Sequence, residues 1–412
     1  MSPSKIHYGW IVVFTGLLVT IGAHGFGRMS YTIILPAMKD GLHLNYTQLG
    51  LIGTGNLIGY LAMALIGGIL AARLGSRRVI SLSLALMGVT MILTGLAQDF
   101  KSAFFLRMVT GLGHGGAYVP AMALGSAWFA MNRRGFATGI VSAGIGGGTM
   151  IASFIVPLAL SAYGQEGWRY AWVYLGSAVL LIAVIAAVFI RSRPEELGLR
   201  PIGAEAVPSK APVTPAVRNL DWNLVYKEKK MWYLGLVYSL YGFSYIIYMT
   251  FFAAYLVKEM GWKPGAASAL WALVGGVSIF CGVLWGGISD RLGRAKGAAL
   301  VYLGLSVSSL IFALVKSDSG LYGSALLFGL CAWSIPTIMA ATAGDFVGPR
   351  LAPAGLGFVT LFFAGGQAVG PWVGGYLADL TRSFTGPFLL AAAVSLLGGL
   401  LALGLKPAVQ KR

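Results

Sequence analysis

The sequence is poor in charged residues, above all in acidic ones. Of its 412 residues, 10% are charged and only 13 are Asp or Glu, whereas 57% are hydrophobic. Ordinary soluble domains carry about 25% charged residues, so this composition excludes an ordinary soluble fold. The mean hydropathy of +0.78 and the 59 glycines favour a polytopic membrane protein whose helices pack closely through small residues.

Cysteine is also scarce. The two cysteines, Cys281 and Cys331, lie in apolar runs and show neither a C-x-x-C pattern nor a metal-ligand spacing, so we interpret them as small hydrophobic side chains. The sequence offers no candidate nucleophile, metal cluster or pair of buried acids. It therefore predicts no metal, no cofactor and no enzymatic activity.

Twelve apolar runs are each long enough to cross a bilayer, which takes about 20 residues. They begin near Tyr8, Gln48, Val79, Ser102, Phe136, Arg169, Met231, Ala266, Gly297, Gly320, Gly355 and Gly386. One long polar stretch, rich in proline and charge, separates six runs from six. We predict an all-α membrane protein with an N-terminal six-helix half at 1–190, a cytoplasmic linker at 191–230 and a C-terminal six-helix half at 231–412.

The formal charge of +17 could suggest nucleic-acid binding, but its distribution indicates topology. Placing both termini in the cytoplasm assigns 21 of the 30 Lys and Arg residues to cytoplasmic segments and 7 to outer loops, as the positive-inside rule requires. We therefore expect an integral membrane protein with both termini cytoplasmic. Our further expectations are that it is a monomer and that its membrane is a bacterial inner membrane. Its partner is the lipid bilayer, and no nucleic acid is needed.

A loop is repeated in the two halves. The chain reads GILAARLGSRR from Gly68 and GGISDRLGRAK from Gly286, a separation of 218 residues, which predicts two homologous halves. The second copy resembles the signature loop of the major facilitator superfamily. RMVTGLG in the fourth run, GQAVGPWVGG in the eleventh and RPEELGL in the linker are similar to other motifs of that family.

The resemblance implies a carrier that works by alternating access, with the two loops as gates. The gating residues it implies are Gly68, Arg73, Gly75 and Arg77 in the first loop, and Gly286, Asp290, Arg291, Gly293 and Arg294 in the second. Ala72 stands where the family has an acid in the first loop. The opening HYGWIVV resembles the monocarboxylate and oxalate/formate branch, and GFGRMSYTIILPAM is similar to the bacterial YbfB/YjiJ-like carriers.

The fourth run contains Gly-Leu-Gly-His-Gly-Gly, residues 111–116, which satisfies the G-x-G-x-x-G pattern of dinucleotide-binding loops. No strand precedes it and no acid follows about twenty residues later, as that fingerprint requires. We therefore interpret these glycines as sites of close helix packing.

Polar residues recur at helical spacing in the first and fourth runs, so each set lies on one helix face. The two sets are His24, Arg28 and Tyr31, and Arg107, His114 and Tyr118. The resemblance implies inverted three-helix repeats in which spans one and four are counterparts around the cavity, so we expect the two histidines to face each other. No acid lies within any run, and an intramembrane charge costs about 2.5–3.5 kcal/mol. An anionic substrate is therefore the natural counter-ion for the arginines.

Each of these residues has a second interpretation. Arg28 could instead extend to the outer surface, and Arg107 could serve helix packing or gating. His24 and His114 could bond to a neighbouring backbone or could couple transport to protons, because imidazole titrates near working pH. The further substrate-binding candidates, each with packing as the alternative, are Asn56, Tyr60, Tyr241, Tyr245, Trp333 and Gln367.

Taken together, these observations predict a secondary active transporter of a small organic anion, a monocarboxylate or a dicarboxylate. Transport would be coupled to protons or to exchange of a second anion. Two alternatives stay open at this point: efflux of a neutral or amphipathic compound, and a membrane ligand sensor without turnover.

Overall fold

The structure, a computed structural model, describes residues 7–130, 133–203, 222–347 and 351–405. These residues are almost entirely helical and form no β-strand beyond one isolated bridge. The chain divides into two compact units: Met1–Ala206 with Leu256–Gly275, and Val207–Tyr255 with Gly276–Arg412. The chain ends and residues 204–221 of the predicted linker lie outside the described residues, and the predicted domain boundaries stay a prediction.

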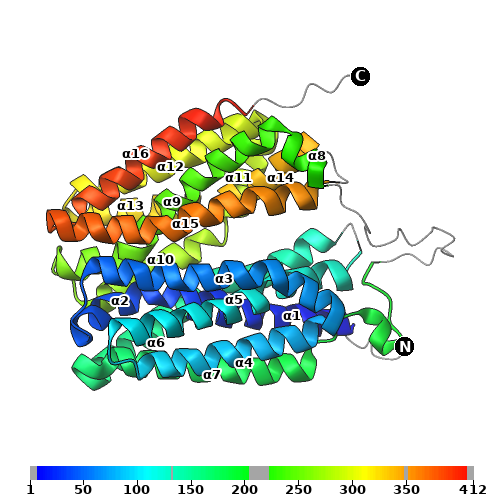
Figure 1. Cartoon of the computed structure of the whole chain (residues 1–412), viewed down its shortest axis with the longest axis horizontal. Coiled ribbons are helices and arrows are strands. Elements are labelled where there is room, and N and C mark those ends of the chain that lie inside the picture. The colour runs from blue at the N-terminus through cyan, green and yellow to red at the C-terminus, as the bar shows by residue number, and fades with distance from the viewer. Residues whose placement is uncertain (1–6, 131–132, 204–221, 348–350, 406–412) are drawn as a thin grey trace. The chain divides into compact units, whose positions relative to one another are not determined.

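Unit 1 contains the first six spans (Figure 1). Its helices are α1 (Tyr8–Thr20), η1 (Ile21–Met29), α2 (Ser30–Gly41), α3 (Tyr46–Leu74), α4 (Ser76–Gly95), α5 (Phe100–Trp128), α6 (Arg134–Tyr163), η2 (Gly164–Glu166), α7 (Gly167–Phe189) and η3 (Pro194–Leu197), with most of α10 (Pro264–Ser278). Within it α5 packs against both α3 and α4, and α6 against α1 and η1.

Unit 2 contains the remaining spans. Its helices are α8 (Trp222–Lys227), most of α9 (Lys229–Lys258), α11 (Cys281–Leu292), α12 (Arg294–Leu314), α13 (Asp318–Cys331), α14 (Ile335–Val347), α15 (Ala352–Thr381) and α16 (Thr385–Ala402). Within it α12 packs against α16, and the two lie side by side in Figure 1.

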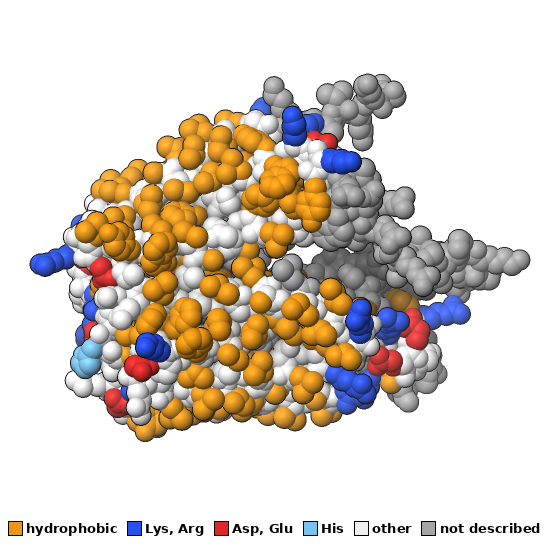
Figure 2. All heavy atoms as spheres, viewed as in Figure 1, with side chains coloured by type: hydrophobic (Ala, Val, Ile, Leu, Met, Phe, Trp, Pro, Cys, Tyr) orange, Lys and Arg blue, Asp and Glu red, His pale blue; other side chains and the backbone are white. Residues whose placement is uncertain are grey.

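The predicted spans are present. Eight stretches of the described chain are long and apolar enough to cross a membrane, or nine if the bent helix α3 is counted, and one of the eight comprises both α6 and α7. Helix α5 and the α10–α11 pair complete the twelve. Each begins within three residues of the start predicted from sequence. On the face shown in Figure 2, hydrophobic side chains cover the middle of the helices and charged ones gather toward their ends.

Two spans are broken, between α10 and α11 and between α13 and α14. A break leaves backbone carbonyls without helical partners, which is tolerated in a membrane only where other groups satisfy them. Here the Trp285 indole N–H donates to the Leu330 carbonyl at 2.8 Å, and the Ser334 hydroxyl donates to the Cys281 carbonyl at 3.2 Å. Side chains near each break therefore bond to the other broken span.

Glycines allow α5 to lie directly against its neighbours. A Cβ atom added to Gly111 would lie 2.0 Å from the Asn56 carbonyl oxygen, and one added to Gly115 would lie 2.3 Å from that of Tyr60. Real Cβ atoms do not approach backbone this closely, so only glycine fits. The Gly-rich sequence of α5 thus has a packing role, as its place inside a span predicted.

Helix α5 begins with a capping box. The Asp99 carboxylate accepts a hydrogen bond from the backbone N–H of Ser102 at 2.8 Å, and the Ser102 hydroxyl oxygen accepts one from the Asp99 N–H at 3.3 Å. This cap satisfies two N–H groups that a helix start leaves unbonded. The backbone bond from Ser102, with a second from its hydroxyl, holds the pKa of the Asp99 carboxyl below its usual value.

We expect Asp99→Ala to lower the unfolding temperature at neutral pH. Because the folded-state pKa is depressed, the charge stabilises the fold above the unfolded-state pKa of about 3.9, and this part of the stabilisation is lost as the pH falls through the folded-state value. Asp99→Asn is the control, since it keeps the cap without the charge. Equal unfolding temperatures for the wild type and Asp99→Ala at pH 7 would contradict the assignment.

Candidate functional site

The first span changes helix type where its polar residues lie. Between α1 and α2 the nine residues of η1 form a π-helix, in which hydrogen bonds run from i to i+5 and which is often found at functional sites. His24 and Arg28 both belong to this segment, so the α-helical face predicted for His24, Arg28 and Tyr31 does not continue through it. Every residue of η1 is buried.

The two histidines meet. The Nδ1 atom of His24, in η1, lies 3.1 Å from the Nε2 atom of His114, in α5, and the side chains are 6% and 1% exposed. A hydrogen bond between two imidazole nitrogens requires one protonated and one unprotonated nitrogen. One imidazole N–H therefore bridges the two rings. Nδ1 of His114 has no hydrogen-bond partner, so this atom can accept or donate a further hydrogen bond.

Aromatic rings surround this pair and connect it to Arg28. The Tyr60 ring centroid lies 4.5 Å from that of His114, and the Tyr118 centroid lies 4.9 Å from that of His24. The Arg28 guanidinium lies over the Tyr60 ring, 5.9 Å from its centroid, at the range of a cation–π contact. We call His24, Arg28, Tyr60, His114 and Tyr118 the His–Arg cluster.

Arg28 is buried, with 8% of its surface exposed, so it does not extend to the outer surface as its alternative interpretation proposed. Among the residues that the structure describes, no Asp or Glu is buried. The core of the described chain therefore supplies no carboxylate to this guanidinium. A buried positive charge of this kind favours an anion beside it, because charge is costly to remove from water and an opposite charge offsets that cost.

Arg107 lies in a different environment although it shares a helix with His114. Its Nη1 donates to the Gly27 carbonyl at 2.8 Å, and its guanidinium lies between the rings of Trp172 and Tyr31, at 4.6 and 5.1 Å from their centroids. It is 1% exposed. These contacts tie α5 to η1 and α7, as its packing interpretation expects.

The neighbours of Arg107 are also bonded to backbone. The Asn56 side-chain amide donates to the Arg107 carbonyl at 3.0 Å, and the Tyr31 hydroxyl donates to the Leu49 carbonyl at 2.8 Å. Thus the structure places His24, Arg28, His114 and Tyr118 together, and it places Tyr31, Asn56 and Arg107 beside them in a region bonded to backbone.

In unit 2 the predicted tyrosines form a stack. The Tyr241 and Tyr245 rings lie 4.5 Å apart and nearly parallel, and Phe363 stacks beside both. The Tyr241 hydroxyl bonds to the Ala332 carbonyl at the α13–α14 break, and the Gln367 amide bonds to the Tyr245 hydroxyl. The Oε1 atom of Gln367 is buried without a hydrogen-bond partner.

Trp333, the other candidate of unit 2, is half-buried in the α13–α14 break and lies edge-on to Phe328 at 6.3 Å. Among the described residues, no ring contact or hydrogen bond joins Trp333 to the tyrosine stack. The stack and Trp333 thus stay separate features of unit 2.

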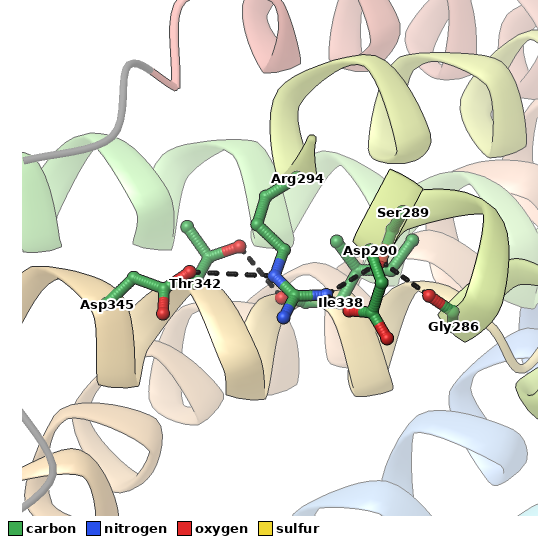
Figure 3. Close-up of polar contacts among 7 residues, drawn as sticks. All are labelled: Gly286, Ser289, Asp290, Arg294, Ile338, Thr342 and Asp345. Carbon is green, nitrogen blue, oxygen red and sulfur yellow. Dashed lines mark hydrogen bonds and ion pairs between the residues drawn. The ribbon is translucent and has the colours of Figure 1, made fainter. Parts of the chain in front are cut away.

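The second gating loop forms an ion-pair network (Figure 3). The Arg294 guanidinium pairs with Asp290 one turn before it and with Asp345 of α14, its Nε lying 3.5 Å from the Asp345 Oδ2 atom. It also donates to the Ser289 hydroxyl at 2.9 Å. The first loop has Ala72 in place of an acid, and within the described part of the chain its arginines form no such pair.

Some contributors were not predicted. Trp172 and Phe363 gave no signal beyond apolarity, and their importance comes only from the ring that each presents to Arg107 or to the tyrosines. Tyr60, in contrast, was a candidate from sequence, as an aromatic residue on the same span as Asn56. The structure separates the two, since Tyr60 contacts the histidines and Asn56 bonds to the Arg107 backbone.

Comparison with known proteins agrees with this architecture. A model of the Major Facilitator Superfamily matches residues 17–352 and 280–412. A "Probable sulfoacetate transporter" of Cupriavidus necator is 27% identical, over 92% of this chain and 90% of that protein. "Monocarboxylate transporter 12" of Rattus norvegicus is 24% identical, over 97% of this chain and 86% of that protein.

A solved structure has the same fold. The bacterial homologue of the human lysosomal transporter Spinster, in an inward-facing and unoccupied conformation, superposes with a TM-score of 0.75 at 19% identity, covering 98% of this chain and 95% of that one. The chain belongs to the Major Facilitator Superfamily. It is a membrane transporter rather than an enzyme.

Proposed function

We propose that the protein carries a small organic anion across the membrane by alternating access, with Arg28 as the counter-charge for the substrate. The observation that carries the proposal is the burial of Arg28 beside two imidazoles, in a described chain whose acids are all outside the core. Relatives named as transporters of sulfoacetate and of monocarboxylates support an acid as substrate.

In this proposal the two halves rock about a site near the middle of the membrane. Arg28 attracts the carboxylate or sulfonate, because a guanidinium presents paired N–H donors that match such groups. The Arg294 network would help to close one end of the carrier. The protein would reside in the bacterial inner membrane with both termini cytoplasmic.

Counterflow in proteoliposomes tests the function. Vesicles preloaded with unlabelled lactate, oxalate or sulfoacetate are given a trace of the same labelled anion, and lactamide serves as the neutral counterpart of lactate. We expect transient accumulation of at least one anion and none of the amide. Binding without counterflow would instead indicate a sensor, and uptake of the amide alone would indicate a carrier of neutral compounds.

We further propose that the His24–His114 pair couples transport to protons. One imidazole N–H bridges the two rings at 3.1 Å, and an added proton would go to a ring nitrogen outside that hydrogen bond, such as the unpartnered Nδ1 atom of His114. Protonation would therefore add a positive charge near Arg28, which favours an anion there. Symport requires that uptake rise when the outside is made more acidic than the inside.

We expect His24→Gln and His114→Gln each to retain anion counterflow but to lose the stimulation by an inward proton gradient. Glutamine keeps a hydrogen-bonding side chain and removes the titration. His43→Gln is the matched control, because His43 is exposed near the end of α2. A full response to the gradient in both cluster variants would remove the histidines from the mechanism.

A further inference from the structure

A basic pocket lies in unit 1 where the loop between α3 and α4 meets α5. It has a volume of about 810 Å³, and its walls include one acid, Glu196, and four arginines, Arg73, Arg77, Arg78 and Arg193. Four arginines against one glutamate leave three positive charges in excess. Among the described residues, no ion pair joins any of these arginines to an acid.

The corresponding loop of unit 2 shows what is missing. Gly75 has backbone angles of 87° and 140°, and Gly293, 218 residues later, has 89° and 152°. Helices α5 and α13 also begin 218 residues apart, at Phe100 and Asp318. The two loops therefore have the same backbone geometry, and residues can be matched between them one by one.

In unit 2 two carboxylates, Asp290 and Asp345, pair with Arg294 of the loop (Figure 3). The residues of unit 1 at the same separation of 218 are Ala72 and Ala127, and both line the basic pocket. Alanine therefore occupies both positions where unit 2 supplies negative charge. By the same separation Arg294 matches Ser76, whereas Arg73 and Arg78 match Arg291 and Lys296. The pocket thus keeps cations of the loop and lacks both carboxylates.

The start of α4 adds to the positive potential. This 20-residue helix follows Gly75, which has no side chain to cap it, and its first turn contains no acid. The N-terminus of a helix carries a partial positive charge and unbonded N–H groups, which together favour anions. Within the described residues, the side-chain acceptor at this turn is the Ser192 hydroxyl, 3.3 Å from the Arg77 backbone nitrogen.

We propose that this pocket binds the phosphate group of an anionic ligand. Arginine forks match phosphate oxygens, and an excess of three positive charges suits a group with more than one negative charge. The α5 side of the pocket is apolar, with Val119, Pro120 and Ala123, so the rest of the ligand can be hydrophobic. The phosphate could be free, on a soluble metabolite, or on the headgroup of an anionic lipid.

Two binding measurements on the purified full chain separate these sources. Equilibrium dialysis with labelled inorganic phosphate, in an uncharged detergent, tests a free phosphate. Nanodiscs of phosphatidylcholine with and without phosphatidylglycerol, followed by mass spectrometry of the lipids retained by the protein, test a headgroup. We expect saturable, salt-sensitive binding in at least one of the two.

Restoring the missing carboxylate is the decisive variant. Ala72→Asp should weaken binding by about tenfold, which corresponds to about 1.4 kcal/mol, whereas Ala72→Asn should change it by less than about twofold. Ala72 is exposed, so both variants are expected to fold. Arg73→Gln combined with Arg78→Gln should weaken binding further.

Two controls locate the site. Arg291→Gln removes a charge from the matching loop of unit 2 and should leave binding unchanged, and Arg28→Gln should also leave it unchanged, which separates this pocket from the proposed transport site. The proposal is overturned if neither probe binds saturably, or if Ala72→Asp binds as tightly as the wild type.

Discussion

Arg28→Gln is expected to reduce organic-anion uptake by about 10- to 100-fold. A hydrogen-bonded charge pair contributes about 1.5–3 kcal/mol, and about 1.4 kcal/mol corresponds to each factor of ten. Arg28 is 8% exposed and no acid of the described chain is buried with it, so no buried carboxylate of those residues competes with the substrate for its charge. Initial rates of uptake into proteoliposomes measure the effect.

Arg28→Lys tests the geometry of the same group. Lysine keeps the charge but loses the two parallel N–H bonds of the guanidinium, so we expect uptake between those of the wild type and Arg28→Gln. Circular dichroism and gel filtration would establish that both variants fold. Unchanged uptake by Arg28→Gln would exclude Arg28 as the counter-charge and would shift the proposal toward a neutral substrate.

Gly25→Ala is expected to lower the stability of the protein by about 2–3 kcal/mol or more, at the upper end of overpacking effects. A Cβ atom on Gly25 would lie 2.4 Å from the Gly148 Cα and 2.5 Å from its carbonyl carbon. Both are backbone atoms of α6, which cannot move aside as the end of a side chain can. The π-helix must then shift, and His24 and Arg28 shift with it.

The loss should appear in two measurements: a lower unfolding temperature in detergent and reduced anion uptake by the protein that remains folded. Gly147→Ala is the matched control on α6, one residue from Gly148, because a Cβ there meets nothing within 4 Å. If Gly25→Ala is as stable and active as Gly147→Ala, the close contact between η1 and α6 is not needed for the site.

The spans could be predicted because bilayer thickness fixes the length of each apolar run, and a run of that length is visible in a single sequence. The meeting of His24 with His114 was also predictable, since the two-fold arrangement of three-helix repeats pairs the first span with the fourth. Both inferences depend on regularities that extend over twenty residues or more.

The π-helix was not predictable, because the spacing of His24, Arg28 and Tyr31 reads as one ordinary helix face and gives no sign of the i+5 bonding in η1. The different surroundings of Arg107 and His114 were not predictable either. They share a helix face by spacing, yet Trp172 and Tyr31 enclose Arg107, and those contacts come from α7 and α2. Sequence spacing reports the direction of a side chain but not its neighbours.

The Gly-rich stretch of α5 also affects how a mutational scan of this protein would be interpreted. Its glycines face two neighbouring helices: Gly111 and Gly115 meet the backbone of α3, and Gly113 and Gly116 meet residues of α4. A mutational scan would therefore record residues 111–116 as intolerant, with the same profile that a nucleotide-binding loop would give. In this transporter such a profile reports how closely three helices approach. A method that uses only the sequence motif and the intolerance to substitution, without the distances between helices, would mistake this stretch for a cofactor site.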